Sequence, residues 1–123
     1  MRYNSKSWKV IFHETFDEEF QAFAESVQNA IVANAAMLKE FGPQLGRPYV
    51  DTLDGSGHSN MKELRFDADN GVWRVAFAFD PKRQAVLLVV GNKSGTSQKR
   101  FYKSLIKKAD QRFDDWLARQ EGE

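Results

Sequence analysis

The sequence predicts an α+β domain in which helices pack on a small antiparallel sheet. Three short segments between positions 61 and 91 have the apolar pattern of strands, and turn-forming residues separate them. One more strand-like segment and two segments with helical spacing precede this group, and a third helical segment follows it. Strands joined by short turns pair antiparallel, so the helices are expected to cover one face of the sheet. Residues 1–123 are expected to form a single domain.

The first part of the chain predicts a strand and a helical hairpin. In SWKVIFHE (7–14) large apolar residues alternate with other residues, as in a strand. Thr15 or Asp17 is expected to cap the first helix, which has acids in its first turn. Ser26 is expected to cap a second helix, VQNAIVANAAMLKEF (27–41), which a Gly-Pro pair ends.

The second part predicts a loop, a three-stranded meander and a last helix. Residues 49–60 are rich in turn formers and are expected to form the loop. The strands are MKELRFD (61–67), VWRVAFAFD (72–80) and AVLLVVG (85–91), with turn signals between them. The third strand is apolar on both faces, which is typical of a central or covered strand. The last helix is expected from Ser97 to about Gln120.

Composition excludes several classes of protein. The chain has no cysteine, which rules out disulfides and suits a reducing cytosol. Neither a secretory signal nor a membrane-spanning stretch is found, so a cytoplasmic protein is expected. The two histidines lie far apart and form no metal motif, and the spacings of a P-loop and of a nucleophile elbow are absent. No metal and no cofactor are therefore expected.

Two arginines lie in neighbouring predicted strands, on the face opposite the large apolar side chains. The short turn between the strands places Arg65 directly opposite Arg74. Like charges that face each other across a ladder cost stability, and a bound anion between them would remove that cost. The alternative is that nearby acids pair with the arginines on an ordinary solvated face. These acids are Glu63, Asp67 and Asp69.

Small residues continue the arginine face of the second meander strand. Ala76 and Ala78 follow Arg74 at alternate positions. Their small side chains predict a shallow depression beside Arg74 in which a bulky ligand can lie. This pattern favours the functional interpretation of the arginines.

Positive charge is concentrated in the C-terminal third of the chain. Seven Lys or Arg and one acid lie between positions 91 and 112, whereas the whole chain has a formal net charge of +1. Such a local cluster predicts contact with a phosphate backbone, and its alternative is a solvated helix face. The predicted RNA-binding residues in this cluster are Arg100, Lys103 and Lys107.

Four other residues are candidates for chemistry. Lys93 follows a buried strand in a glycine-bracketed turn, and Lys99 and Tyr102 lie near the start of the last helix. Tyr102 offers a hydroxyl or a surface on which a base can stack. His58 lies in the loop before the Arg65 strand, where an imidazole can act as a general acid or base. The alternatives are a solubilising lysine, a tyrosine at the edge of the core and an incidental surface histidine.

Five motifs in order resemble a known family. They are LGRP, KELRF, WRVAFAFDP, AVLLVVGNKSG and RFYKSLIKKAD, and the resemblance covers roughly residues 8–117. The chain resembles the HigB-type, phage Gp49-like branch of the RelE/ParE superfamily, whose members are toxins of type II toxin–antitoxin modules. The resemblance implies a RelE-like fold, an mRNA endonuclease that often acts on the translating ribosome, and a cognate helix-turn-helix (HigA-like) antitoxin.

Family positions are carried over motif by motif. The arginine of the ELR motif is Arg65, and the arginine before the next apolar run is Arg74. The lysine after the last strand is Lys93, and the start of the last helix supplies Lys99 and Tyr102.

Two features differ from the family pattern. Many RelE-like nucleases have a His or Tyr near the C-terminus, whereas the tail DDWLARQEGE has neither. Some HigB toxins also have a His near the end of the last strand, where this chain has GNKSG. The general acid and base therefore stay open among Lys93, Lys99 and His58.

Three functions fit these observations. The leading hypothesis is a toxin that inhibits translation as a metal-independent mRNA endonuclease, in which the RNA 2′-hydroxyl attacks the adjacent phosphorus and Arg65 and Arg74 stabilise the phosphorane. The first alternative is a non-nucleolytic protein, either a ParE-like toxin that acts on DNA gyrase or a catalytically silent antitoxin-binding protein. The second alternative is a generic RNA-binding module. The predicted strands of this chain lack the aromatic stacking motifs of such modules, which counts against it.

Overall fold

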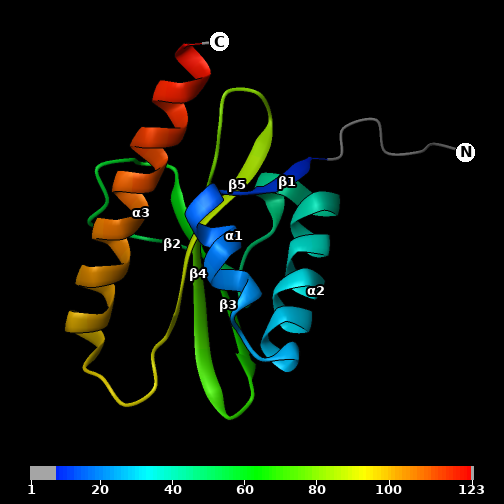
Figure 1. Cartoon of the computed structure of the whole chain (residues 1–123), viewed down its shortest axis with the longest axis vertical. Helices are drawn as coiled ribbons and strands as arrows, with labels where there is room; N and C mark the ends of the chain where they lie inside the picture. Colours follow the sequence, from blue (N-terminus) through cyan, green and yellow to red (C-terminus); the bar gives the residue numbers. More distant parts are fainter. Residues whose placement is uncertain (1–7, 123) are drawn as a thin grey trace, which may run out of the picture.

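The structure is a computed structural model that describes residues 8–122. One five-stranded sheet has the order β1-β5-β4-β3-β2 (Figure 1). Strands β2 to β5 pair antiparallel, and β1 pairs parallel with β5. The strands are β1 (Lys9–Phe12), β2 (Val50–Thr52), β3 (Met61–Ala68), β4 (Gly71–Phe79) and β5 (Gln84–Asn92). The predicted α+β class and the meander are confirmed, and the parallel β1 makes the sheet mixed.

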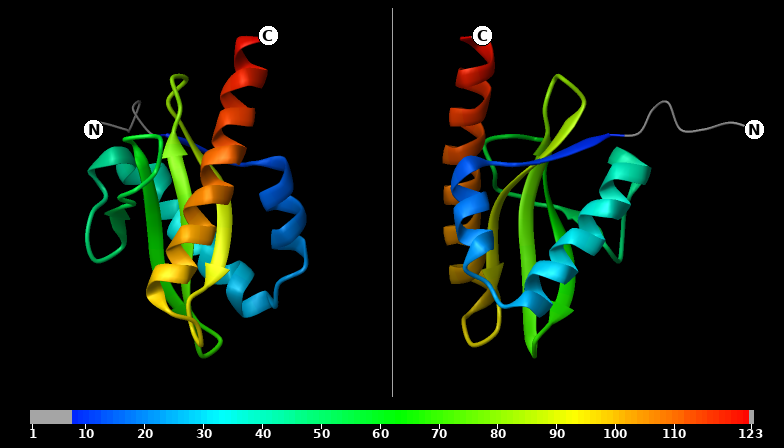
Figure 2. Two further views of the ribbon diagram at one scale, coloured as in Figure 1. Left: turned by 90° about the vertical axis from the view of Figure 1, so that its left-hand side faces the viewer. Right: turned by 45° about the vertical axis from the view of Figure 1, so that its right-hand side comes forward.

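Helices cover both faces of the sheet (Figure 2). They are α1 (Glu14–Gln21), α2 (Glu25–Phe41), the short 3₁₀ helix η1 (Gly42–Gln44) and α3 (Gln98–Glu121). Helices α1 and α2 pack with the large apolar side chains of β3, β4 and β5, whereas α3 packs on the opposite face. The expectation that all helices lie on one face is therefore wrong.

The alanine face of β4 is where α3 packs. Ala76 and Ala78 are fully buried, and they lie in one apolar cluster with Leu105, Ala109 and Phe113 of α3. The predicted ligand depression is thus filled by the helix, because small strand residues allow a helix to approach closely.

The caps of the first two helices differ from the prediction. His13 caps α1, because its Nδ1 accepts a hydrogen bond from the Thr15 N–H at 3.1 Å. Ala24 occupies the N-cap position of α2 and makes no side-chain cap hydrogen bond. Helix α3 begins where it was expected, after Ser97, whose hydroxyl caps the helix by accepting from the Arg100 N–H at 3.2 Å.

Strand β2 lies inside the segment that was expected to be a loop. Val50 is the one apolar residue of this three-residue edge strand; it is buried and pairs with Leu64. The sequence signal was weak because the strand has only three residues. The register between β3 and β4 is as expected: Asp67 pairs with Val72, and Arg65 pairs with Arg74.

Helix α3 is fastened to the sheet at its C-terminal half. The buried carboxylate of Asp80, at the end of β4, accepts hydrogen bonds from Trp116 Nε1 at 2.9 Å and Gln120 Nε2 at 2.7 Å. Gln84 also donates to Asp80 at 2.7 Å. Burial alone raises the pKa of Asp80, but these hydrogen bonds outweigh it and hold the pKa below its ordinary value. Within residues 8–122 no helix is both long and apolar enough to cross a membrane.

Candidate functional site

A polar groove of about 560 Å³ lies between the β2–β3 edge of the sheet and the first half of α3. Its volume is in the range of pockets that hold small ligands. Three sequence candidates, Arg65, Lys93 and Tyr102, line this groove. The other lining residues are Arg47, Asp51, Thr52, Leu53, Asp54, Glu63, Gln98 and Ile106.

The groove is formally neutral. Its cations are Arg47, Arg65 and Lys93, and three carboxylates oppose them. One of these, Asp51, accepts a hydrogen bond from Arg47 Nη2 at 2.9 Å and lies 3.7 Å from Arg65 Nη1. The hydrogen bond from Arg47 lowers the pKa of Asp51. The groove therefore holds no excess of cations over carboxylates.

Glu63 lies between the two cross-strand arginines. Only 5% of the residue is exposed. Its Oε1 lies 3.7 Å from Arg74 Nε, and its Oε2 lies 4.0 Å from Arg65 Nε. The Tyr102 hydroxyl donates a hydrogen bond to Oε1 at 2.8 Å. The anion that relieves the facing arginines is thus part of the chain itself, as the alternative of pairing with nearby acids had it.

Burial dominates the titration of this network. It raises the pKa of Glu63, and the Tyr102 hydrogen bond and the two arginines offset it only in part. Burial also raises the pKa of Tyr102, and its hydrogen bond to Glu63 adds to that rise. Glu63 is consequently a stronger base than an exposed glutamate, and it sits within hydrogen-bond reach of a hydroxyl that faces the groove.

The two arginines differ in exposure. The Arg74 side chain is 7% exposed, and it donates from Nη1 to the Trp73 carbonyl at 2.9 Å and from Nε to the Tyr102 hydroxyl oxygen at 3.3 Å. The Arg65 side chain is 33% exposed and lines the groove. Arg65 can therefore contact a ligand directly. The buried Arg74 instead holds Tyr102 and Glu63 in place through its contacts with both side chains.

The basic residues of α3 fall on different sides of the helix. Successive residues are rotated by about 100°. Gln98, Tyr102 and Ile106 line the groove. Lys99 is exposed next to that face, and two further exposed lysines follow it at four-residue steps, Lys103 and Lys107. Arg100 lines a different groove on the other side of the helix. The Lys93 ammonium lies 5.8 Å from the centre of the Tyr102 ring.

His58 is not brought to the groove. Its Nε2 lies 2.7 Å from Asp114 Oδ1, and its ring centre lies 4.9 Å from that of Phe113. Asp114 follows Tyr102 by twelve residues along α3, which corresponds to about 18 Å of helix. His58 thus joins the loop before β3 to the C-terminal half of α3.

Sequence reasoning treated Glu63 only as a surface partner of the arginines. The available signal was its place two residues before Arg65, which puts both side chains on one face of β3. Asp51 and Gln98 were missed because neither lies in a motif. Only the pairing of β2 with β3 and the packing of α3 bring them beside Arg65.

Comparisons with known proteins define the family. The family model described as "Phage derived protein Gp49-like (DUF891)" matches residues 18–114. The chain is 42% identical over 113 residues to "Putative toxin HigB3" of Mycobacterium tuberculosis, which covers 92% of this chain and 96% of that protein. It is 47% identical over 89 residues to "Putative toxin HigB2" of the same organism, which covers 72% of this chain and 44% of that protein.

Solved structures show the same fold. A mutant of the Escherichia coli toxin RelE in the free state has a TM-score of 0.59 at 13% identity, over 83% of this chain and 96% of RelE. The archaeal RelE of the RelE–RelB complex from Pyrococcus horikoshii has a TM-score of 0.53 at 18% identity, over 73% of this chain and 99% of that one.

The fold is therefore of the RelE-like class. Within this class the chain belongs to the Gp49-like family and is a HigB-type toxin of a toxin–antitoxin system. The family resemblance that the five sequence motifs predicted is confirmed.

Proposed function

We propose that this toxin is an endonuclease that cleaves mRNA in the groove between β3 and α3. The observation that carries the proposal is the convergence of Arg65, Lys93 and Tyr102 on one groove, with the buried Glu63 carboxylate 2.8 Å behind the Tyr102 hydroxyl. Guanidinium and ammonium groups suit a phosphate, and a hydroxyl backed by a base suits proton transfer. The similarity to HigB and RelE toxins supports the same class of activity.

The proposed reaction uses the RNA as its own nucleophile and needs no metal. The 2′-hydroxyl oxygen bonds to the adjacent phosphorus while its proton passes to Tyr102, whose own proton passes to Glu63. The bond from phosphorus to the 5′-oxygen breaks, and the leaving oxygen takes a proton from the Lys93 ammonium. Arg65 holds the phosphorane oxygens, a role worth about 3 kcal/mol for a single donor. The products are a 2′,3′-cyclic phosphate and a 5′-hydroxyl.

The ribosome is the proposed place of cleavage. The groove is formally neutral, so it attracts free RNA weakly, and a phosphate must compete with Asp51 for Arg65. A ribosome that presents the mRNA in a fixed geometry offsets this weakness. The exposed row of Lys99, Lys103 and Lys107 is proposed to contact RNA phosphates beside the groove.

The proposed partner is an antitoxin of the helix-turn-helix, HigA-like type. The archaeal RelE neighbour was solved as a complex with RelB, which supports an antitoxin partner for this chain. The HigA-like type is supported by the similarity to the HigB toxins.

Induced expression tests the function. Wild-type protein is expected to arrest growth, lower translation and create new internal transcript ends, and Arg65→Ala is expected to lose these effects at equal soluble expression. Arrest with intact transcripts and impaired DNA supercoiling would favour the gyrase alternative. Normal growth with ample soluble protein would contradict the proposed toxicity.

A further inference from the structure

The outer edge of β5 is only partly covered. Strand β1 pairs with β5 as far as Leu87, and across residues 8–122 no strand pairs with residues 88–92 on that side. The Lys93 N–H donates to the Val72 carbonyl of β4 at 2.7 Å. Because backbone groups alternate along an antiparallel ladder, the N–H and C=O groups of Val90 and Asn92 point away from β4. They form a short free strand edge.

One end of this edge is closed. Arg112 of α3 donates from Nη1 to the Leu88 carbonyl at 2.7 Å. It also forms an ion pair with Glu19 of α1 at 2.8 Å. The bridge between α3 and α1 therefore passes around the strand at Leu88, and the open edge begins beyond it.

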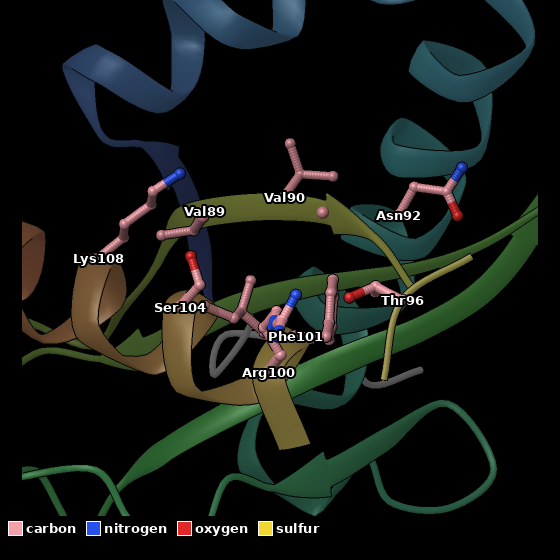
Figure 3. Close-up of a pocket in the computed structure, with 10 residues that line it drawn as sticks. Val89, Val90, Asn92, Thr96, Arg100, Phe101, Ser104 and Lys108 are labelled. Atoms are coloured by element: carbon pink, nitrogen blue, oxygen red, sulfur yellow. The ribbon is translucent and has the colours of Figure 1, made fainter. Parts of the chain in front are cut away.

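A second groove, of about 290 Å³, runs between this edge and α3 (Figure 3). Its apolar lining comes from β5 and from the inner side of α3, with Val89, Phe101 and Leu105. Its rim carries the exposed Arg100 and Lys108. In the described part of the chain neither of these two cations has an acidic partner, whereas Arg47, Arg65, Arg74, Arg112 and Arg119 all do.

We propose that this groove binds an extended, acidic peptide segment of a partner protein, which adds to β5 as a further strand. Main-chain hydrogen bonds to Val90 and Asn92 would supply affinity, as in other cases of strand addition. Alternate side chains of the segment would enter the apolar groove, and its acidic residues would pair with Arg100 and Lys108. A nucleic acid fits less well, because it cannot continue the backbone ladder and gains little from the apolar lining.

This interface is separate from the proposed RNA groove. Arg100, Ser104 and Lys108 each follow a groove-lining residue of α3 by two positions, which rotates them by about 200°. The body of α3 therefore lies between the two grooves. A bound segment would leave Arg65 and Tyr102 accessible. The proposed peptide interface therefore does not depend on the proposed nuclease activity, and each can be tested without the other.

Selection of peptides tests this interface. A phage-displayed library of random ten-residue peptides is selected on the purified full chain, and bound peptides are synthesised and measured by fluorescence anisotropy. Enriched peptides are expected to alternate Asp or Glu with apolar residues. Their dissociation constants are expected to rise at least tenfold with Val90→Pro, which removes an outward N–H, and with the double variant Arg100→Glu/Lys108→Glu.

Matched controls decide the outcome. The double variant Lys103→Glu/Lys107→Glu changes the same charge on the outer side of α3 and is expected to bind the peptides as wild type does. Amide exchange in the wild-type complex is expected to slow at Val90 and Asn92, which does not depend on how well Val90→Pro folds. The proposal is overturned if acidic peptides are not enriched, or if both groove variants bind them normally. It is also overturned if the groove binds a ten-nucleotide RNA but no peptide, and if this RNA binding is lost in Arg100→Glu/Lys108→Glu but kept in Val90→Pro.

Discussion

Glu63 occupies the space between two arginines that face each other across the β3–β4 ladder. From sequence, these arginines were expected either to bind an external anion or to pair with nearby acids on a solvated face. Pairing with Glu63 is what the structure shows, but the pair is buried, so Arg74 is part of a satisfied internal network. The register was predictable from the turn, but the burial of the network was not, since it depends on α3 covering this face.

Arg74→Ala is therefore expected to destabilise the protein. The substitution leaves the buried Glu63 carboxylate short of its closest cation and removes a donor to Tyr102. Breaking a buried pair of this kind costs about 3 kcal/mol. Arg65→Ala, at a side chain that is 33% exposed, is the matched control and is expected to cost less than about 1 kcal/mol. Urea unfolding of both variants checks this, and equal stabilities would contradict the role given to Glu63.

Glu63 also predicts a pH dependence of stability. Burial raises the folded-state pKa of Glu63 above the ordinary value of 4.5. Between pH 4.5 and the folded-state pKa, the folded state therefore binds more protons than the unfolded state. The contribution of Glu63 to the free energy of unfolding is then full below pH 4.5 and falls as the pH rises through the folded-state pKa. Glu63→Gln removes this part of the profile.

Chemical denaturation from pH 4 to pH 8 compares the two proteins. The difference in unfolding free energy, wild type minus Glu63→Gln, is expected to decrease as the pH rises. A difference that stays flat or increases would show that the arginines outweigh burial at this site.

At the scale of elements, the sequence predicted the three α-helices, strand β1 and the three meander strands, because their apolar patterns are regular. It did not predict β2 or the two N-terminal caps. A three-residue strand has almost no period, and a histidine cap such as His13 is outside the usual cap residues. The face on which α3 packs was also missed, since Ala76 and Ala78 suit a ligand and a helix equally well.

The attachment of α3 gives a test at this scale. Asp80→Ala leaves the Trp116, Gln84 and Gln120 donors without their shared acceptor and is expected to cost about 2–3 kcal/mol. Asp67→Ala, at an exposed position of β3, is the control and is expected to change stability by less than about 0.5 kcal/mol. Thermal or urea unfolding measures both, and a neutral Asp80→Ala would remove this carboxylate as an anchor of the helix.

At the scale of the whole molecule, the positive charge that stands out in the sequence is divided by α3. Part of it faces the neutral groove, part faces the free edge of β5, and the lysine row faces outward. The number of Lys and Arg residues along the sequence does not show which side of α3 each of them faces. That side follows from the helical rotation of residues once the packed face of α3 is known.

The outward row predicts the salt dependence of RNA binding. The triple variant Lys99→Ala/Lys103→Ala/Lys107→Ala is expected to reduce the slope of log affinity against log salt by about 2 for single-stranded RNA. Lys9→Ala/Lys39→Ala, with exposed lysines in β1 and α2, is the control and is expected to keep the wild-type slope. Fluorescence anisotropy over a salt series measures this, and an unchanged slope in the triple variant would mean that the row is only a solvated face.

The chemistry of the cleaved ends tests the central claim most directly. Transcripts from cells that express wild-type toxin are expected to carry 5′-hydroxyl and 2′,3′-cyclic phosphate ends at new internal sites. Tyr102→Phe keeps the ring but removes the hydroxyl that joins the groove to Glu63, so cleavage is expected to fall by about 10²–10⁴-fold at equal soluble expression. New ends that carry 5′-phosphates, or full cleavage by Tyr102→Phe, would contradict the proposed role of this groove.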